Sequence, residues 1–375
     1  MKKIFLIILS VTTSNLIYSQ CNGRYQTEIF NSVNKVTVSY SDIYNDGFHE
    51  MDIYTADGDS ELNRPVIIFM HGGTFIGGDK STPDCVDFCE SFAKRGYVTI
   101  SMNYRLANNV ISFLTSNETQ FETVLKAVYD AKSAVRFLRK DYVNGNIYGI
   151  DTSTIFVGGY SAGGVIAIHQ AYIDAINDLP TSFVDNNGSI LNFQNLATTI
   201  GGIHELEGDA GNYGFSSRVS GVISYAGGIH DLSWIDEFDE PLVSAHGTSD
   251  LTVNYNCGPG QNNPLVFTLC GAGEMQPQAN LVGINNDALI FNNEGHSWAV
   301  SGNSNANFFQ ANNFTSDFLF PLLPCNTTTF TNNIKENRKI ISIKNVLGKS
   351  TTPKINTPLY YIFSDGTVEH RMLIE

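Results

Sequence analysis

Runs of apolar residues alternate with amphipathic segments along most of this chain. A short, continuous apolar run is typical of a strand buried on both faces of a parallel sheet. Segments with strand character occur at 65–70, 97–102, 154–160, 219–225, 241–245 and 288–291. Between them, apolar residues at helical spacing predict helices over 83–95, 120–142 and 306–322. This alternation predicts an α/β fold in which a parallel sheet carries helices on both faces.

Two regions depart from that alternation. The segments 36–44 and 49–54 look like strands joined by the turn residues Asn45-Asp46-Gly47, which predicts an antiparallel edge. The stretch from about 175 to 217 is rich in Asn, Gly and Asp and has weak periodicity. It predicts a loop-rich insertion, which is either a lid beside a functional site or a surface loop with no functional role.

One serine stands where a predicted strand turns sharply into a helix. Ser161 lies between Gly159 and Gly163 in a Gly-x-Ser-x-Gly pattern. A serine at such a turn adopts a strained backbone, which the chain tolerates when its neighbours have no side chain to collide. The pattern together with its strand and helix predicts a nucleophile elbow.

Two more polar clusters follow later strands of the predicted sheet. His246-Gly247-Thr248-Ser249-Asp250 follows one strand, and Glu294-Gly295-His296 follows the last. The carboxyl ends of parallel strands meet at one edge of a sheet, so Ser161, Asp250 and His296 can converge there. Asp231 and Asp236 also follow a predicted strand and are the alternatives to Asp250.

These residue types suit acyl transfer. His296 would take the proton of the Ser161 hydroxyl, and Asp250 would orient the imidazole and stabilise its charge. The oxyanion that forms needs donors already in place, and we expect the backbone N–H groups of Gly72, Gly73 and Ala162 to supply them. A turn serine and a surface histidine are the alternatives for Ser161 and His296.

Composition narrows the function classes. The 375 residues carry a net charge of −15, which disfavours nucleic acid and anionic membranes as partners because both repel negative charge. We find no histidine and cysteine spacing typical of a metal site, and the motifs imply no cofactor.

The N-terminus and the cysteines indicate export. Residues 1–20 have a basic start and a short apolar stretch, which predicts a signal peptide; lipid attachment at Cys21 is an alternative that Gln20 disfavours. Six cysteines in an exported chain predict disulfides. Of fifteen possible pairings we expect Cys85 with Cys89, Cys257 with Cys270, and Cys21 with Cys325.

The character of the chain changes near residue 326. A Thr- and Asn-rich linker at 326–334 leads into short alternating segments. From Lys335 onward there are seven Lys or Arg and four Asp or Glu, so this part is +3 and the rest is −18. The contrast predicts two domains, 21–325 and 335–375.

The motifs resemble those of a known family. His71-Gly72-Gly73-Thr74-Phe75 resembles the oxyanion loop, and Gly159 to Gly164 the nucleophile elbow, of α/β-hydrolases of the carboxylesterase and hormone-sensitive-lipase type. The resemblance covers about 35–323 and implies a mostly parallel, doubly wound sheet, a serine triad and hydrolysis of carboxylic esters. Segments 342–349 and 359–374 resemble the sorting domain of type IX secretion systems, which implies a small all-β tail domain and passage across an outer membrane.

The sequence therefore predicts a secreted serine ester hydrolase that works through a covalent acyl-enzyme. Its expected partners are a small or polymer-linked ester and the secretion machinery, with no nucleic acid and no transmembrane segment in the mature protein. The alternatives are a serine peptidase of the prolyl-oligopeptidase type and a non-catalytic binding protein on the same fold. The acyl and alcohol groups of the substrate stay open.

Overall fold

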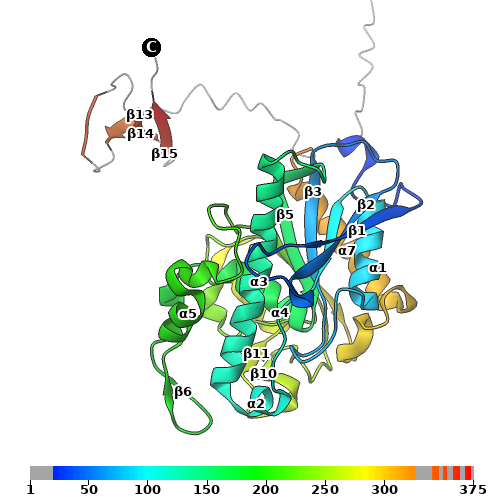
Figure 1. Ribbon diagram of the computed structural model, residues 1–375, viewed down its shortest axis with the longest axis vertical. Helices are drawn as coiled ribbons and strands as arrows, with labels where there is room; N and C mark the ends of the chain where they lie inside the picture. The colour runs from blue at the N-terminus through cyan, green and yellow to red at the C-terminus, as the bar shows by residue number, and fades with distance from the viewer. Residues whose placement is uncertain (1–19, 326–339, 346–348, 353–357, 364–367, 373–375) are drawn as a thin grey trace, which may run out of the picture. The chain divides into compact units, whose positions relative to one another are not determined.

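The computed structural model describes residues 20–325, 340–345, 349–352, 358–363 and 368–372 (Figure 1). The chain divides into two compact units, Met1–Asn326 and Thr327–Glu375. The expected linker at 326–334 and all but the last residue of the expected signal peptide lie outside the described residues.

The first unit is built on an eight-stranded sheet. Its strand order is β1-β2-β4-β3-β5-β8-β9-β12. The pairs β1–β2 and β2–β4 are antiparallel, and all other neighbours are parallel. The predicted α/β sheet with an antiparallel edge is thus confirmed, with these strands: β1 (Val33–Ser39), β2 (Glu50–Ala56), β3 (Arg64–Met70), β4 (Val98–Met102), β5 (Ile150–Tyr160), β8 (Gly221–Tyr225), β9 (Leu242–Gly247) and β12 (Asn286–Phe291).

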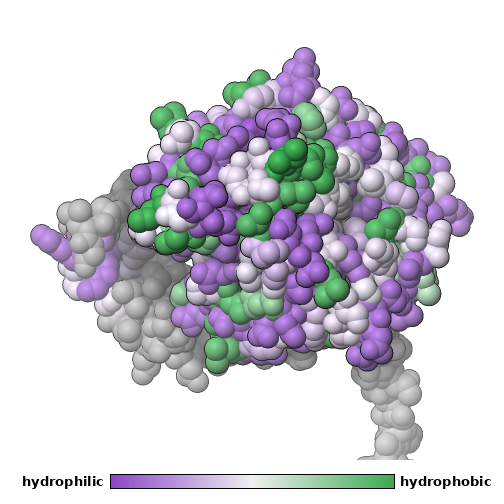
Figure 2. Space-filling model, turned by 90° about the horizontal axis from the view of Figure 1, so that it is seen from below, coloured by the Kyte–Doolittle hydropathy of each residue, from purple (hydrophilic) through white to green (hydrophobic). Residues whose placement is uncertain are grey.

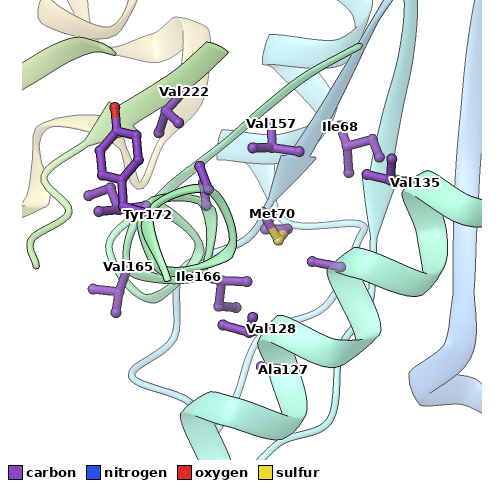
Figure 3. Packing of buried hydrophobic residues seen from close by; sticks show 14 of the residues in the cluster. Ile68, Met70, Ala127, Val128, Val135, Val157, Val165, Ile166, Tyr172 and Val222 are labelled. Carbon is purple, nitrogen blue, oxygen red and sulfur yellow. The ribbon is translucent and has the colours of Figure 1, made fainter. Parts of the chain in front are cut away.

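Helices cover both faces of this sheet, as the alternation predicted. Helices α1 (Pro83–Lys94) and α7 (Ala306–Leu319) share one buried cluster with Ile67 and Phe69 of β3. The cluster on the other face contains Ile68 and Met70 of β3, and its helices are α3 (Asn117–Val143), α4 (Ala162–Tyr172) and α6 (Ala272–Val282). Figure 3 shows Ile68 and Met70 between the sheet and the helices α3 and α4. Successive side chains of β3 point to opposite faces, so its apolar run fills two cores.

Strand order places a crevice at the middle of the sheet. From β3 the chain passes through α1 to β4 on one side, and β5 lies on the other side of β3. In open α/β sheets the loops after two such strands diverge and leave a crevice at their carboxyl ends. The loop after β3 begins at His71, and the turn after β5 is Ser161.

Several short elements beside this crevice were not predicted. The insertion at 175–217 contains helix α5 (Phe193–Gly201) and a hairpin of β6 (Phe183–Val184) and β7 (Ile190–Leu191), so it is more ordered than the sequence suggested. Helix α2 (Val110–Thr115) and the hairpin β10 (Cys257–Pro259) and β11 (Thr268–Cys270) were also missed. Elements α2, β6, β10 and β11 lie at the lower end of the view in Figure 1.

Seen from that end, the surface is mixed. Figure 2 shows apolar residues in separate patches among polar ones. Ile111 of α2, Val184 of β6 and Ile190 of β7 are among the exposed apolar side chains of these short elements. None of the helices in the described ranges has the length and apolar character needed to cross a bilayer.

Two of the three expected disulfides are present. Cys21 is bonded to Cys325, and Cys257 to Cys270. The expected bond between Cys85 and Cys89 is wrong, because both are free and buried in α1. Side chains four residues apart on a helix have Cβ atoms about 5–6 Å apart, whereas a disulfide needs about 3.8 Å. Burial instead raises the pKa of both thiols well above the ordinary value.

The second unit is a small sheet. Strands β13 (Ile340–Lys344), β14 (Pro358–Phe363) and β15 (Val368–Met372) pair antiparallel in that order. Leu359 is buried in it, with Ile343 packed against it. The expected all-β character of the tail is confirmed for the residues described.

Candidate active site

Ser161 occupies a strained turn between β5 and α4. Its backbone angles are φ 56° and ψ −117°, in the region that side chains disfavour. Its N–H donates to the Tyr225 carbonyl of β8 at 2.8 Å. A Cβ on Gly159 would lie 2.3 Å from the Gly163 carbonyl carbon, and one on Gly163 would lie 2.0 Å from the Met70 oxygen. The two glycines are therefore required by contacts across the turn.

The three residues predicted to converge do lie together. His296 Nε2 is 2.8 Å from Ser161 Oγ, and His296 Nδ1 is 2.7 Å from Asp250 Oδ2. The two other candidate acids are engaged elsewhere, since Asp231 accepts from the Ser233 N–H and Asp236 accepts from the Phe238 N–H. Ser161 and Asp250 are buried, while the imidazole is 14% exposed and so faces the crevice.

The Asp250 carboxylate is fully hydrogen-bonded. Its Oδ1 accepts from the N–H groups of Thr252 and Val253 at 2.8 and 3.0 Å. Burial alone would raise the pKa of Asp250, but hydrogen bonds from His246 and His296 and their electrostatic effect hold it well below its ordinary value. The acid is therefore ionised at neutral pH and available to stabilise an imidazolium at His296.

Two further side chains contact Asp250 and His296. His246, the first residue of the motif that ends in Asp250, has its Nε2 2.9 Å from the Val253 carbonyl and 3.3 Å from Asp250 Oδ2. Tyr160 donates its hydroxyl to the His296 carbonyl at 2.8 Å, and its ring stacks on the His296 ring. The position of Tyr160 next to Ser161 was visible in the sequence, but its contact with His296 depends on the fold.

The expected oxyanion donors are not equivalent. The Gly72 N–H donates to Asp84 Oδ2 at 3.1 Å, so this donor is already occupied. Within the described part of the chain, the N–H groups of Gly73 and Ala162 have no acceptor. Ala162 is the first residue of α4, where the helix dipole favours an anion. Gly73 and Ala162 are thus the better candidates of the three.

An apolar pocket opens beside Ser161. Its empty volume is about 900 Å³, part of it open to solvent. The wall consists mainly of aliphatic and aromatic side chains, among them Phe113, Phe121, Val124, Val165, Phe193, Trp234 and Phe267. Such a wall accepts an apolar group and offers few partners to a charged one.

Segments far apart in the sequence are tied together around this pocket. Gln120 of α3 donates to the carbonyls of Phe113 and Leu265 at 2.8 and 3.0 Å. Its side-chain oxygen accepts from Asn117 and from the Phe267 N–H, both at 3.1 Å. The Cys257–Cys270 disulfide closes the loop that carries Leu265 and Phe267. The pocket wall is therefore held by the hydrogen bonds of the Gln120 side chain and by a disulfide bond.

The described residues do not place three or more His, Cys, Asp or Glu side chains together in a way that could hold a metal ion. The chemistry available at the site is that of Ser161, Asp250, His296 and nearby backbone N–H groups.

Sequence comparisons find esterases. The BD-FAE family model matches residues 51–260. Juvenile hormone esterase of Heliothis virescens is 33% identical over 100 residues, 27% of this chain and 16% of that protein. Gut esterase 1 of Caenorhabditis briggsae is 27% identical over 132 residues, 33% of this chain and 22% of that protein. The chain thus matches less than a quarter of the length of these curated relatives.

Solved structures share the fold. A truncated carbohydrate esterase from gut microbiota is 16% identical with a TM-score of 0.50, and the match covers 79% of this chain and 97% of that one. Thermogutta terrifontis esterase 2, phosphoramylated by tabun, is 20% identical with a TM-score of 0.51, covering 76% and 93%.

The carboxylate of Asp250 should contribute stability that depends on pH. Its pKa is lowered by folding, so its contribution is present above the unfolded pKa of about 4 and is lost as the pH falls further. We expect Asp250→Asn to lower the free energy of unfolding by about 1–3 kcal/mol at pH 7, and the gap to wild type to narrow by pH 3. Urea unfolding at the two pH values measures this.

Asp231→Asn is the matched control, because this carboxylate also follows a strand of the sheet, and its hydrogen bonds in the described part of the chain come from Ser233 and not from a histidine. Its effect should be small at both pH values. A gap between wild type and Asp250→Asn that stays constant from pH 7 to 3 would contradict the proposed electrostatic contribution.

Proposed function

Because the chain belongs to the BD-FAE family, we propose that it is a carboxylic ester hydrolase acting through a covalent acyl-enzyme on Ser161. One observation carries the proposal: a single imidazole, that of His296, contacts the Ser161 hydroxyl on one side and the Asp250 carboxylate on the other. This arrangement serves nucleophilic catalysis on a carbonyl, and the strained, glycine-flanked turn at Ser161 supports it further.

In the first half of the reaction, Ser161 Oγ attacks the ester carbonyl carbon while its proton passes to His296 Nε2. The carbonyl oxygen becomes an oxyanion, for which the N–H groups of Gly73 and Ala162 are the proposed donors. When the tetrahedral intermediate collapses, the bond to the alcohol oxygen breaks and His296 returns the proton to it. The alcohol leaves, and the acyl group stays on Ser161.

In the second half, water replaces the alcohol. The water oxygen attacks the acyl carbon while His296 takes a proton from the water. His296 then gives this proton to Ser161 Oγ as the carboxylic acid leaves. Throughout, Asp250 holds Nδ1–H of His296 and stabilises the imidazolium. No cofactor takes part in the proposed sequence.

The pocket beside Ser161 supports a preference on the acyl side. Its wall is mostly apolar and includes Ser161 and Ala162. We place the acyl chain there, and assign the enzyme to esters whose acyl group is apolar and larger than acetyl. The alcohol group faces solvent in this proposal, which allows either a small or a polymer-linked ester.

Loss of the nucleophile should abolish turnover. We expect Ser161→Ala and His296→Ala to reduce kcat for p-nitrophenyl butyrate by about 10⁴-fold or more, and Ser161→Ala to lose labelling by a fluorophosphonate probe. Ser304→Ala, at an exposed position, and His204→Ala, at a partly buried position where the ring stacks on Tyr213, are the controls. Neither residue lines the pocket, and both variants should resemble wild type. A wild-type protein that neither hydrolyses esters nor labels would favour the binding-protein alternative, and cleavage of prolyl peptides alone would favour the peptidase.

Narrowing the pocket should change acyl selectivity. Val124 lies on the pocket wall, and Val124→Phe fills part of the space. We expect kcat/KM for the octanoate ester relative to acetate to fall about tenfold or more. Val143→Phe, at an exposed position of the same helix, should leave the ratio unchanged. If the ratio is the same in Val124→Phe and wild type, the acyl group does not bind in this pocket.

The proposal extends to export. Residues 1–20 have the composition of a signal peptide, the two disulfides are consistent with an oxidising compartment, and segments of 335–375 resemble a type IX sorting domain. We assign the mature enzyme to the cell surface or the medium. Residues 335–375 would be the sorting signal that the secretion machinery recognises.

Deletion of residues 335–375 tests this assignment in a host that has a type IX system. We expect the shortened protein to keep its esterase activity but to remain in the periplasm, whereas Ser161→Ala with the tail reaches the surface or the medium. Fractionation and immunoblotting measure both. Equal export with and without the tail would contradict the assignment.

A further inference from the structure

The loop between β3 and α1 has an unusual backbone. Three consecutive residues have positive φ: Gly73 at 126°, Thr74 at 59° and Phe75 at 60°. Such a conformation is strained for a residue with a side chain, so it persists only where its surroundings hold it. This loop supplies one proposed oxyanion donor, and its shape therefore bears on the reaction.

The start of the loop is clamped from two sides. His71 Nδ1 contacts the Gly72 carbonyl at 2.6 Å, and the Tyr104 hydroxyl donates to the His71 carbonyl at 2.8 Å. The Gly72 N–H donates to Asp84 Oδ2 at 3.1 Å. Both polar groups of Gly72 are thus engaged immediately before the first positive φ.

Asp84 is placed to serve as a fixed acceptor. It is the second residue of α1 and only 4% exposed. A negative charge in the first turn of a helix is favoured by the helix dipole. Burial raises the pKa of the Asp84 carboxyl, which hydrogen bonds and the neighbouring His71 partly offset. In either protonation state the carboxyl can accept the Gly72 N–H.

The contact lies close to the nucleophile. A Cβ built on Gly72 would be 3.4 Å from Ser161 Cβ. The Gly73 carbonyl accepts from the N–H groups of Ile76 and Gly77, so the next peptide is also fixed. Small displacements of this loop therefore move the Gly73 N–H relative to the reacting carbonyl, and catalytic donors tolerate errors of only about 0.5 Å.

We propose that Asp84 is a positioning residue, which sets the orientation of the oxyanion loop through the Gly72 N–H and leaves the Gly73 N–H for the oxyanion. It does not touch the substrate. This inference rests on the proposed esterase function and adds to it a residue from outside the triad.

The test compares Asp84→Ala with Asp84→Asn, which keeps an oxygen acceptor in the same place. Because the loop acts on the transition state, we expect kcat for p-nitrophenyl butyrate to fall about 100-fold in Asp84→Ala, with KM within about threefold of wild type. Asp84→Asn should keep kcat within about fivefold. The rate of fluorophosphonate labelling of Ser161 should follow kcat in both variants.

Asp87→Ala is the matched control. Asp87 lies on the same helix, and its Oδ2 accepts the Asn303 N–H at 2.6 Å, in a loop other than the oxyanion loop. This variant loses the same kind of contact and should keep the kcat of wild type, whatever its Tm.

The possible outcomes distinguish failure of the positioning role of Asp84 from failure of the esterase function. Wild-type kcat in a folded Asp84→Ala protein would overturn the positioning role while the esterase function stands. Equal loss of kcat in Asp84→Ala and Asp84→Asn would also overturn it, since the retained acceptor should rescue. A wild-type protein that shows neither turnover nor labelling would overturn the esterase function, and the positioning role with it.

Discussion

The geometry of the site depends on one close backbone contact, between the turn at Ser161 and the end of β3. Gly163 lies so near the Met70 carbonyl that no side chain fits between them. This contact brings the start of α4 against the strand that leads into the oxyanion loop. Ser161, a helix N-terminus and a run of positive-φ residues therefore lie close together, although Gly73 and Ser161 are 88 positions apart in the sequence.

The site also requires that the buried carboxylate of Asp250 keep its hydrogen-bond donors. Asp250 is nearly excluded from water, and an unpaired carboxylate there would be strongly destabilising. Two backbone N–H groups and two imidazoles surround it, one of them His246, which is itself buried. The acid is consequently held in place before a substrate arrives. The same loop continues into the pocket wall, so the position of the acid and the shape of the pocket share one scaffold.

Much of this arrangement could be predicted from the sequence, because it depends on local pattern and chain order. Apolar runs identify the strands, glycines identify the turn at Ser161, and the carboxyl ends of neighbouring strands bring Asp250 and His296 to the same edge. The contact of the Gly72 N–H with Asp84 could not be predicted, since it depends on how α1 sits against the loop. Gly72 was accordingly expected to be an oxyanion donor.

Short elements were missed for a different reason. Helix α2 has six residues, too few to show a period, and α6 contains Pro277, which argues against a helix. In α5 the apolar residues do have helical spacing, at Phe193, Leu196, Ala197 and Ile200. This period was not recognised because the surrounding stretch is rich in polar residues. The Cys85–Cys89 pairing failed because sequence proximity says nothing about the separation of two side chains on a helix.

The apolar pocket has a consequence for the stability of the protein. Several of its lining residues, among them Val128, Val165 and Phe193, also belong to the buried cluster between the sheet and helices α3 and α4. The pocket is thus an interruption of the hydrophobic core, and the acyl chain that we propose to bind there would complete the packing. Since anything that binds only the folded state shifts the folding equilibrium, substrate supply and resistance to unfolding become thermodynamically linked. The secreted ester hydrolase that we propose would therefore resist unfolding best while an ester is bound.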